Sequence, residues 1–176
     1  MLRTMFLITC TAVLSGCGLG SDGVVQREGQ PDYVEAYDQG RMDAAIAEAE
    51  GTLDTFVEAL RADNPDHSGF ALKKGFAYGE SGKEFIWIDT VALDGDGFTG
   101  VINNAPVNDI GVSEGEKVRV ARSEVADWLY MDGESLRGGY TVVALAYGSK
   151  EEAQYEKQMG IDWSRYEFLQ IDSSEK

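Results

Sequence analysis

Four carboxylates lie close in the sequence to tryptophans, an arrangement that could support acid–base chemistry on a sugar. Glu84 and Asp89 flank Trp87, and Glu124 and Asp127 precede Trp128. Glycosidases use a pair of carboxyl groups at the scissile bond, and tryptophan rings offer apolar surfaces that stack on sugar rings. With 31 Asp and Glu in 176 residues, such neighbours arise often from composition alone. A carboxylate-dependent hydrolase acting on a glycan such as cell-wall material is therefore the alternative hypothesis.

His67, the only histidine, is a weak candidate for catalysis. A histidine-based triad needs a separately positioned nucleophile, and Ser68 is the adjacent residue. No nucleophile-elbow motif occurs in the sequence. Zinc prefers four His or Cys ligands, which one histidine and no free cysteine cannot provide. We interpret His67 as a loop residue without a catalytic role.

Asp94 and Asp96 are oxygen donors two residues apart, as at the start of a calcium-binding loop. The rest of that loop is missing, because Gly97 comes too early and Phe98 occupies the next donor position. The segment 94–97, Asp-Gly-Asp-Gly, instead favours a hairpin turn. We expect no metal site and no cofactor.

Cys17 has the clearest chemistry, because Leu-Ser-Gly-Cys at 14–17 closes a short apolar leader. Arg3 supplies a positive start and residues 5–13 are apolar, the anatomy of a signal peptide over 1–16. The apolar run is shorter than the roughly 20 residues of a membrane span. The leader resembles those of bacterial lipoproteins, in which this cysteine carries a diacylglyceryl group and an acylated amine. That resemblance implies lipidation of Cys17 with acyl chains such as palmitate.

A lipidated Cys17 would place the protein outside the cytoplasm, anchored to a membrane by its acyl chains. Cys10 leaves with the leader, so the mature chain has no free thiol. By resemblance to lipoprotein sorting in Gram-negative bacteria, Gly18 rather than aspartate implies the outer membrane, facing the periplasm. Residues 17–40 are rich in Gly and polar side chains and predict a flexible tether.

The charge of the chain limits its partners. Lys and Arg number 15 against 31 Asp and Glu, a net charge of −16. Nucleic acid is excluded as an expected partner because a phosphate backbone requires a basic patch. The excess of carboxylates is compatible with simple solubility and with a basic protein partner in the envelope.

The elements that position these residues can be read from hydrophobic periodicity. Apolar residues recur at three- and four-residue steps from Met42 to Leu60, which predicts one long amphipathic helix. Asn64-Pro65 ends it, because proline disfavours helical geometry in the residue before it. Segments rich in β-branched and aromatic residues predict strands at 70–76, 84–93, 97–103, 116–121 and 140–147. Both faces of strand 84–93 are expected to be largely buried.

Turn and cap residues complete the fold prediction. Asp132-Gly133 indicates a second hairpin, before strand 140–147. Ser149 followed by Glu152 indicates a capping box that opens a short helix to about Met159, with Gly160 as its end. We predict a single α+β domain over 41–176. Its mainly antiparallel curved sheet of about five strands is packed by one long N-terminal amphipathic helix and a short C-terminal helix.

Seven sequence blocks suggest a family. They are residues 43–56, 70–73, 84–88, 98–104, 114–118, 127–128 and 138–141. Their order and spacing resemble the YegJ-like family of uncharacterised bacterial proteins, which implies a small α+β domain of unknown function. A histidine often follows the glutamate of the tryptophan-containing strand in that family, and Phe85 stands there in this chain.

Polar or amphipathic residues inside these blocks form the candidate binding surface: Lys73, Asn103, Asn104, Asp127 and Trp128. Each also has a structural interpretation, since asparagines form turns, aspartate bonds local amides and tryptophan is usually core. The leading hypothesis is a non-catalytic interaction or ligand-binding module of the cell envelope.

Overall fold

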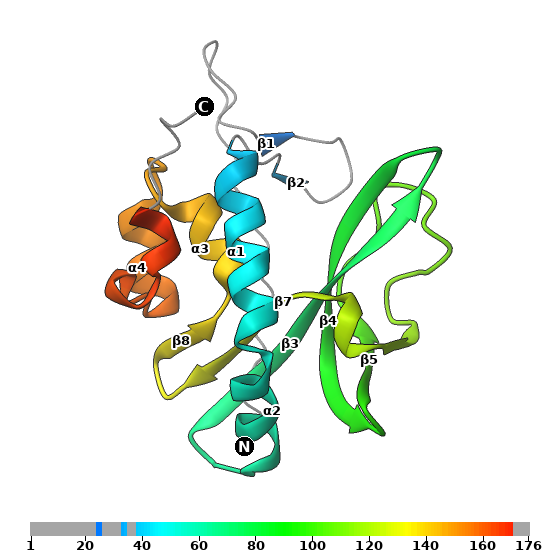
Figure 1. Ribbon diagram of the computed structural model, residues 1–176, viewed down its shortest axis with the longest axis horizontal. Coiled ribbons are helices and arrows are strands. Elements are labelled where there is room, and N and C mark those ends of the chain that lie inside the picture. Colours follow the sequence, from blue (N-terminus) through cyan, green and yellow to red (C-terminus); the bar gives the residue numbers. More distant parts are fainter. Residues whose placement is uncertain (1–23, 26–32, 35–37, 171–176) are drawn as a thin grey trace. The chain divides into compact units, whose positions relative to one another are not determined.

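The computed structural model describes residues 24–25, 33–34 and 38–170 (Figure 1). The chain divides into two units, Met1–Tyr37 and Asp38–Lys176. In the first unit, β1 (Val24–Val25) pairs antiparallel with β2 (Tyr33–Val34) within the segment expected to be a tether. The signal peptide 1–16 and Cys17 lie outside the described residues.

The second unit is built on one antiparallel sheet. Its strands are β3 (His67–Tyr78), β4 (Gly82–Asp94), β5 (Gly97–Ile102), β6 (Lys117–Val120), β7 (Val125–Asp132) and β8 (Ser135–Gly138). The spatial order is β6-β5-β4-β3-β7-β8. This confirms the α+β class, with six strands in the sheet instead of about five.

The expected N-terminal helix is two helices, α1 (Gln39–Gly51) and α2 (Leu53–Arg61). They meet at Thr52, whose hydroxyl donates to the carbonyl of Glu48 at 2.7 Å and to the Tyr140 hydroxyl at 3.0 Å. Gly51 and Thr52 are weak helix formers, and a threonine hydroxyl that bonds the preceding turn bends helices. The prediction of one continuous helix was therefore wrong. Both helices precede β3 in the chain, and α1 contacts β7 (Figure 1).

The expected strand 140–147 is also wrong, because these residues form helix α3 (Tyr140–Ala146). A short apolar run has no period that separates a buried strand from a buried helix. The Asp132-Gly133 hairpin is confirmed, but it leads into β8, which pairs with β7. Gly138 and Gly139 then both adopt φ +68°, a left-handed conformation that turns the chain out of the sheet.

Helix α4 (Glu152–Met159) and its end at Gly160, with φ +60°, agree with the sequence prediction. The capping box expected from Ser149 and Glu152 is not formed. The carboxylate of Glu152 accepts the amide of Gly148, whereas the Ser149 hydroxyl is buried and has no hydrogen-bond partner. Three short 3₁₀ turns complete the described chain: η1 (Arg122–Glu124), η2 (Trp163–Arg165) and η3 (Glu167–Gln170).

The core is aromatic and centres on Phe56 of α2. Its ring centroid lies 5.6 Å from that of Phe70, 6.0 Å from that of Phe98 and 5.8 Å from that of Trp128. The expectation that both faces of β4 are buried was wrong. Ile86 and Ile88 are buried, but Phe85 is 41% exposed. No helix within the described residues is both long enough and apolar enough to cross a bilayer.

Candidate functional site

Asp127 of β7 is fully buried and is the acceptor of a compact hydrogen-bond network. Its Oδ1 accepts the amides of Trp128 at 2.8 Å and Tyr140 at 3.1 Å. Its Oδ2 accepts the amide of Thr141 at 2.8 Å and the Thr141 hydroxyl at 2.6 Å. The first amides of a helix lack internal partners, and Gly139 at the N-cap has no side chain to supply one. Asp127 therefore caps α3 from a neighbouring strand.

Lys73 of β3 completes this network. It lies opposite Asp127 on β7 and Trp87 on β4, so the three residues are cross-strand neighbours in the sheet. The Lys73 Nζ donates to the Thr141 hydroxyl at 2.8 Å and lies 4.9 Å from the centroid of the Trp87 ring. The structure thus brings together two candidates, Lys73 and Asp127, through a threonine that sequence reasoning did not select.

Burial dominates the protonation of both charged groups. It lowers the pKa of Lys73, and the nearby Asp127 carboxylate opposes that shift. It raises the pKa of Asp127, opposed first by Lys73 and then by the hydrogen bonds from Thr141. A buried charge is tolerated when it is paired and hydrogen-bonded. The network is thereby a structural support that fixes β3, β7 and α3 relative to one another.

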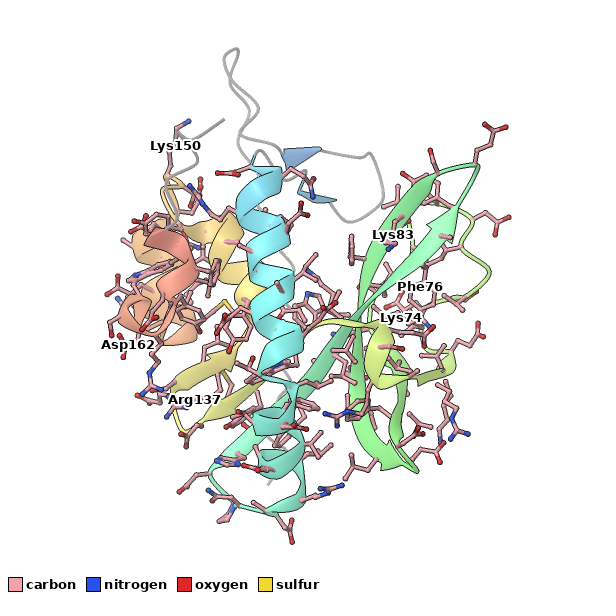
Figure 2. The ribbon with its side chains drawn as sticks, in the orientation of Figure 1. Lys74, Phe76, Lys83, Arg137, Lys150 and Asp162 are labelled. Atoms are coloured by element: carbon pink, nitrogen blue, oxygen red, sulfur yellow. The ribbon has the colours of Figure 1, made fainter. Side chains whose placement is uncertain are left out.

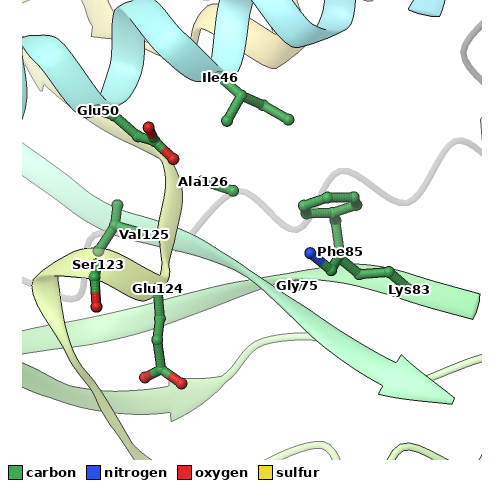
Figure 3. Close-up of a pocket in the computed structure, with 9 residues that line it drawn as sticks. All are labelled: Ile46, Glu50, Gly75, Lys83, Phe85, Ser123, Glu124, Val125 and Ala126. Atoms are coloured by element: carbon green, nitrogen blue, oxygen red, sulfur yellow. The ribbon is translucent and has the colours of Figure 1, made fainter. Parts of the chain in front are cut away.

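A groove runs beside this network, between α1 and the β3–β4 hairpin, with a volume of about 280 Å³ (Figure 3). We call it the α1 groove. Its lining includes Ile46 and Glu50 of α1, Lys83 and Phe85 of β4, Gly75 of β3, and residues 123–126. In Figure 3 the Phe85 ring stands up from its strand toward α1. Figure 2 shows Lys83 on the side of the hairpin toward α1.

A glycine makes room for the exposed ring in the α1 groove. Gly75 pairs with Phe85 across the two strands, one step along the same face from the Lys73–Trp87 pair. A Cβ added at Gly75 would lie 2.6 Å from Lys83 Cδ and 3.1 Å from Phe85 Cε1. The Lys83 Nζ lies 5.9 Å from the centroid of the Phe85 ring. On its strand side, the α1 groove thus presents an apolar ring beside a cation, both on the strand that pairs with β3.

The other three candidate residues do not join Lys73 and Asp127. Trp128 is in the core, 2% exposed, and its Nε1 donates to the carbonyl of Ala49 at 2.9 Å. The amide of Asn103 donates to the carbonyl of Trp87 at 3.0 Å, which continues the sheet beyond β5. Asn103 is exposed and Asn104 is half-buried in the loop that follows. The expected five-residue surface is therefore divided between a buried network, the core and a loop.

Three of the four carboxylates proposed for hydrolysis bind backbone amides, and the fourth, Asp89, accepts the hydroxyl of Thr90 at 3.0 Å. Glu84 accepts the amides of Val107 at 2.7 Å and Asn108 at 2.9 Å, which fastens the loop after β5. Glu124 accepts Lys74 Nζ at 2.8 Å and the amide of Ala121 at 2.9 Å. The hydrogen bond from Lys74 is the main reason that the pKa of Glu124 lies below its ordinary value. With Asp127 bound to α3, these three acids hold three different parts of the fold.

His67 and Asp94 also lie where packing explains them. His67 begins β3, so the interpretation of it as a loop residue was wrong, and its ring centroid is 4.9 Å from that of Tyr130. Asp94 ends β4 before the Gly95-Asp96 turn, which confirms the expected hairpin, and it pairs with Arg119 at 3.3 Å. Over residues 38–170 no group of three or more His, Cys, Asp or Glu side chains is arranged to hold a metal ion.

Sequence reasoning missed Phe85, Gly75 and Ile46 as groove residues. Phe85 had one usable signal, because a phenylalanine replaces the histidine expected there from the family resemblance. Gly75 interrupts the larger residues of the expected strand 70–76, and glycine inside a strand marks a close approach or an open position. Ile46 had none, since it is one of many apolar residues in an amphipathic pattern.

Comparisons with known proteins place the chain among bacterial proteins without assigned activity. Residues 39–163 match the family described as an uncharacterised protein conserved in bacteria (DUF2314). The uncharacterised protein YegJ of Escherichia coli (strain K12) is 32% identical over 119 residues, 66% of this chain and 75% of that protein. The "Putative ankyrin repeat protein NMB1133/NMB1171" of Neisseria meningitidis serogroup B is 34% identical over 92 residues, 50% of this chain and 36% of that protein. No solved structure matches the chain.

Proposed function

The chain belongs to the DUF2314 family of uncharacterised proteins conserved in bacteria, and on that premise we propose that it is a non-catalytic binding module held on the cell envelope by lipid at Cys17. The α1 groove is its binding surface. The membership agrees with the resemblance of the seven sequence blocks to YegJ-like proteins. The matched region, 39–163, includes every residue that lines the α1 groove.

The exposed ring of Phe85 carries the proposal. A phenylalanine that is 41% exposed forgoes part of the free energy of burial, which amounts to about 25 cal/mol for each Å² of apolar surface. Its position above Gly75 and beside α1 gives a partner side chain a recess to enter. Aromatic anchors in recesses are the usual centres of binding energy in protein interfaces.

A protein partner with a basic rim fits the charge of this chain. The net charge of −16 steers cationic surfaces toward it and disfavours acidic ones. Glu50 lies at the α1 groove and is exposed, so it is available to a cation, whereas Glu124 is already paired with Lys74. The partner we propose is an envelope protein that inserts an apolar side chain beside Phe85 and presents Lys or Arg to Glu50.

The alternative, a carboxylate-dependent hydrolase acting on an envelope glycan, has less support. It requires two acids that converge on one cleft at a defined separation. Glu84, Glu124 and Asp127 are each engaged by backbone amides of different segments. Of these three, only Glu124 lines the α1 groove.

The lipid anchor rests on the sequence of the leader. Cys17 lies outside the described residues, so the proposal of lipidation depends on the Leu-Ser-Gly-Cys segment and the apolar run before it. Several acyl chains give a durable anchor because each buried methylene contributes about 0.8 kcal/mol. If the organism is Gram-negative, Gly18 favours the outer membrane, with the domain facing the periplasm.

Site-specific photo-cross-linking in living cells tests this function. A photoreactive amino acid replaces Lys83 at the rim of the α1 groove in the full chain, and a matched variant carries it at Leu93. Leu93 is the control because it is also an exposed large apolar residue, 37% exposed, and does not line the α1 groove. The proposal predicts one abundant cross-linked protein from position 83 and not from position 93. Equal cross-linking at both positions, or none at 83, would contradict it.

A further inference from the structure

A second cavity, of about 180 Å³, lies between β8, α3 and η2, away from the α1 groove. We call it the Arg pocket, because its lining includes Arg137, Arg165, Trp128, Tyr140, Tyr166 and Thr55. We propose that the Arg pocket binds a small carboxylate that carries one flat apolar ring, with the carboxylate on the two guanidinium groups. This site is independent of the partner proposed for the α1 groove.

The first observation is an unsatisfied donor on Arg137. Its Nε donates to Asp132 Oδ2 at 3.0 Å, and its Nη2 donates to the same oxygen at 2.5 Å. The remaining nitrogen, Nη1, is buried and has no hydrogen-bond partner. Buried polar groups in native proteins are nearly always hydrogen-bonded, so an orphaned guanidinium donor at a cavity requires an explanation. Because this nitrogen is closed to solvent, a ligand oxygen in the Arg pocket becomes its acceptor when the Arg137 side chain turns toward the cavity.

The second observation is a second guanidinium at the same cavity. Arg165 Nε donates to Asp162 Oδ2 at 3.1 Å, and its side chain is 53% exposed, so its other nitrogens are accessible. Figure 2 shows Arg137 and Asp162 on the same side of the domain. The lining contains both arginines and no acidic residue, because Asp132 and Asp162, which pair with them, lie outside it. Two arginines without an acid at one cavity favour an anionic ligand.

The third observation is the aromatic wall. The Trp128 and Tyr140 ring centroids are 5.6 Å apart at an interplanar angle of 78°, and those of Tyr140 and Tyr166 are 5.7 Å apart at 79°. The Tyr166 hydroxyl donates to the Gly138 carbonyl at 2.9 Å, which holds its ring against β8. An engineered cavity of about 150 Å³ is known to hold benzene, so the Arg pocket has room for a single ring. Edge-to-face contacts with these rings favour a flat ligand.

Calorimetric titration of the full chain tests the proposal, with benzoate as the probe and benzamide as its neutral counterpart. The proposal predicts saturable benzoate binding and affinity at least about tenfold weaker for benzamide, since a charge-assisted hydrogen bond is worth about 1.5 kcal/mol or more. Benzoate should also shift the amide resonances of Gly138 and Tyr140 in NMR spectra. Equal affinity for benzamide, or no saturable binding of benzoate, would overturn the proposal.

Three charge-removing variants locate the site. Arg165→Gln should weaken benzoate binding about tenfold by the same reasoning, and Arg137→Gln at least as much. Because Arg137 also pairs with Asp132, its variant is interpreted only with an unchanged melting curve; Arg165 keeps the test decisive if that variant unfolds. Arg119→Gln is the matched control, as it removes an exposed Arg–Asp pair elsewhere. Equal losses in Arg165→Gln and Arg119→Gln would contradict the site.

Discussion

The carboxylate of Asp127 accepts both the amide and the hydroxyl of Thr141, at 2.8 Å and 2.6 Å, so that a strand residue caps a helix that begins 13 residues later with Tyr140. Lys73 reaches the same hydroxyl from the neighbouring strand. Thr141 therefore joins a buried acid to a buried base, and the strands of these two residues, β7 and β3, also line the α1 groove.

Removal of Asp127 should be the most damaging of the polar substitutions. Asp127→Ala leaves the first amides of α3 without an acceptor and Lys73 without its opposing charge. We expect a loss of about 3–5 kcal/mol in the free energy of unfolding, the range for leaving a buried charge uncompensated. Urea denaturation followed by circular dichroism measures it. A loss no larger than that of the exposed control Asp96→Ala would show that the network does not stabilise the fold.

The contribution of the Thr141 hydroxyl to stability can be separated from that of the branched side-chain shape. Thr141→Val keeps the branched side chain but removes the donor to Asp127 and the acceptor for Lys73. The expected cost is about 1–3 kcal/mol, the penalty for leaving buried polar groups unsatisfied. Thr141→Ser retains the hydroxyl and should lose less than the valine variant. The opposite order in chemical denaturation would assign the role to the methyl group.

The Lys74–Glu124 pair predicts a specific acid dependence of stability. The pKa of Glu124 lies below its ordinary value of 4.5, first because Lys74 donates a hydrogen bond to it. The folded state therefore binds fewer protons at this group than the unfolded state does. Its stabilisation is complete above the unfolded-state pKa and is lost as the pH falls through the folded-state pKa.

Glu124→Gln should accordingly lose less stability than the wild type between about pH 5 and about pH 3. Lys74→Met should show the same flattened dependence, because it removes the group that lowers the pKa. The effect is small, since the Glu124 side chain is 43% exposed. Melting temperatures over the acidic range measure it, and parallel curves for all three proteins would contradict the assignment.

Lipidation predicts where the protein fractionates. In the native organism, Cys17→Ala should move the protein from the membrane fraction to the soluble fraction and abolish incorporation of labelled palmitate. In the proposed anchor, a single thioether carries the diacylglyceryl group. Cys10→Ala is the control, because the proposed cleavage before Cys17 removes Cys10 with the leader. Membrane retention of the Cys17→Ala protein without label would show that another contact holds it there.

Local sequence signals predicted much of the sheet. The segments 70–76, 84–93, 97–103 and 116–121 all lie within or over observed strands, and both Asp-Gly hairpins are present. The errors occur where tertiary contacts decide. The run after Gly139 is a helix because Asp127 caps it from another strand, and the N-terminal helix is interrupted where Thr52 bonds Glu48 and Tyr140.

The site was harder to predict for the same reason. Lys73 and Asp127 are polar residues within the blocks that resemble the family, but their meeting depends on Thr141, which nothing local to either residue indicates. Trp128 was selected by type and lies in the core. The α1 groove depends on a cross-strand pair, Gly75 with Phe85, and that register exists only once β3 and β4 are paired.

The most direct test of the α1 groove as a binding surface is quantitative capture of the cross-linked partner by three variants of the full chain. Phe85→Ala removes the aromatic anchor, Gly75→Ala pushes a methyl group against Lys83 and Phe85 at the floor of the α1 groove, and Leu93→Ala is the exposed control. Because loss of an aromatic anchor costs about 2 kcal/mol or more, capture affinity should fall at least about tenfold for Phe85→Ala. Gly75→Ala should fall as well, while Leu93→Ala remains at the wild-type level. Undiminished capture by Phe85→Ala and Gly75→Ala, with melting temperatures unchanged, would contradict the α1 groove as the binding surface.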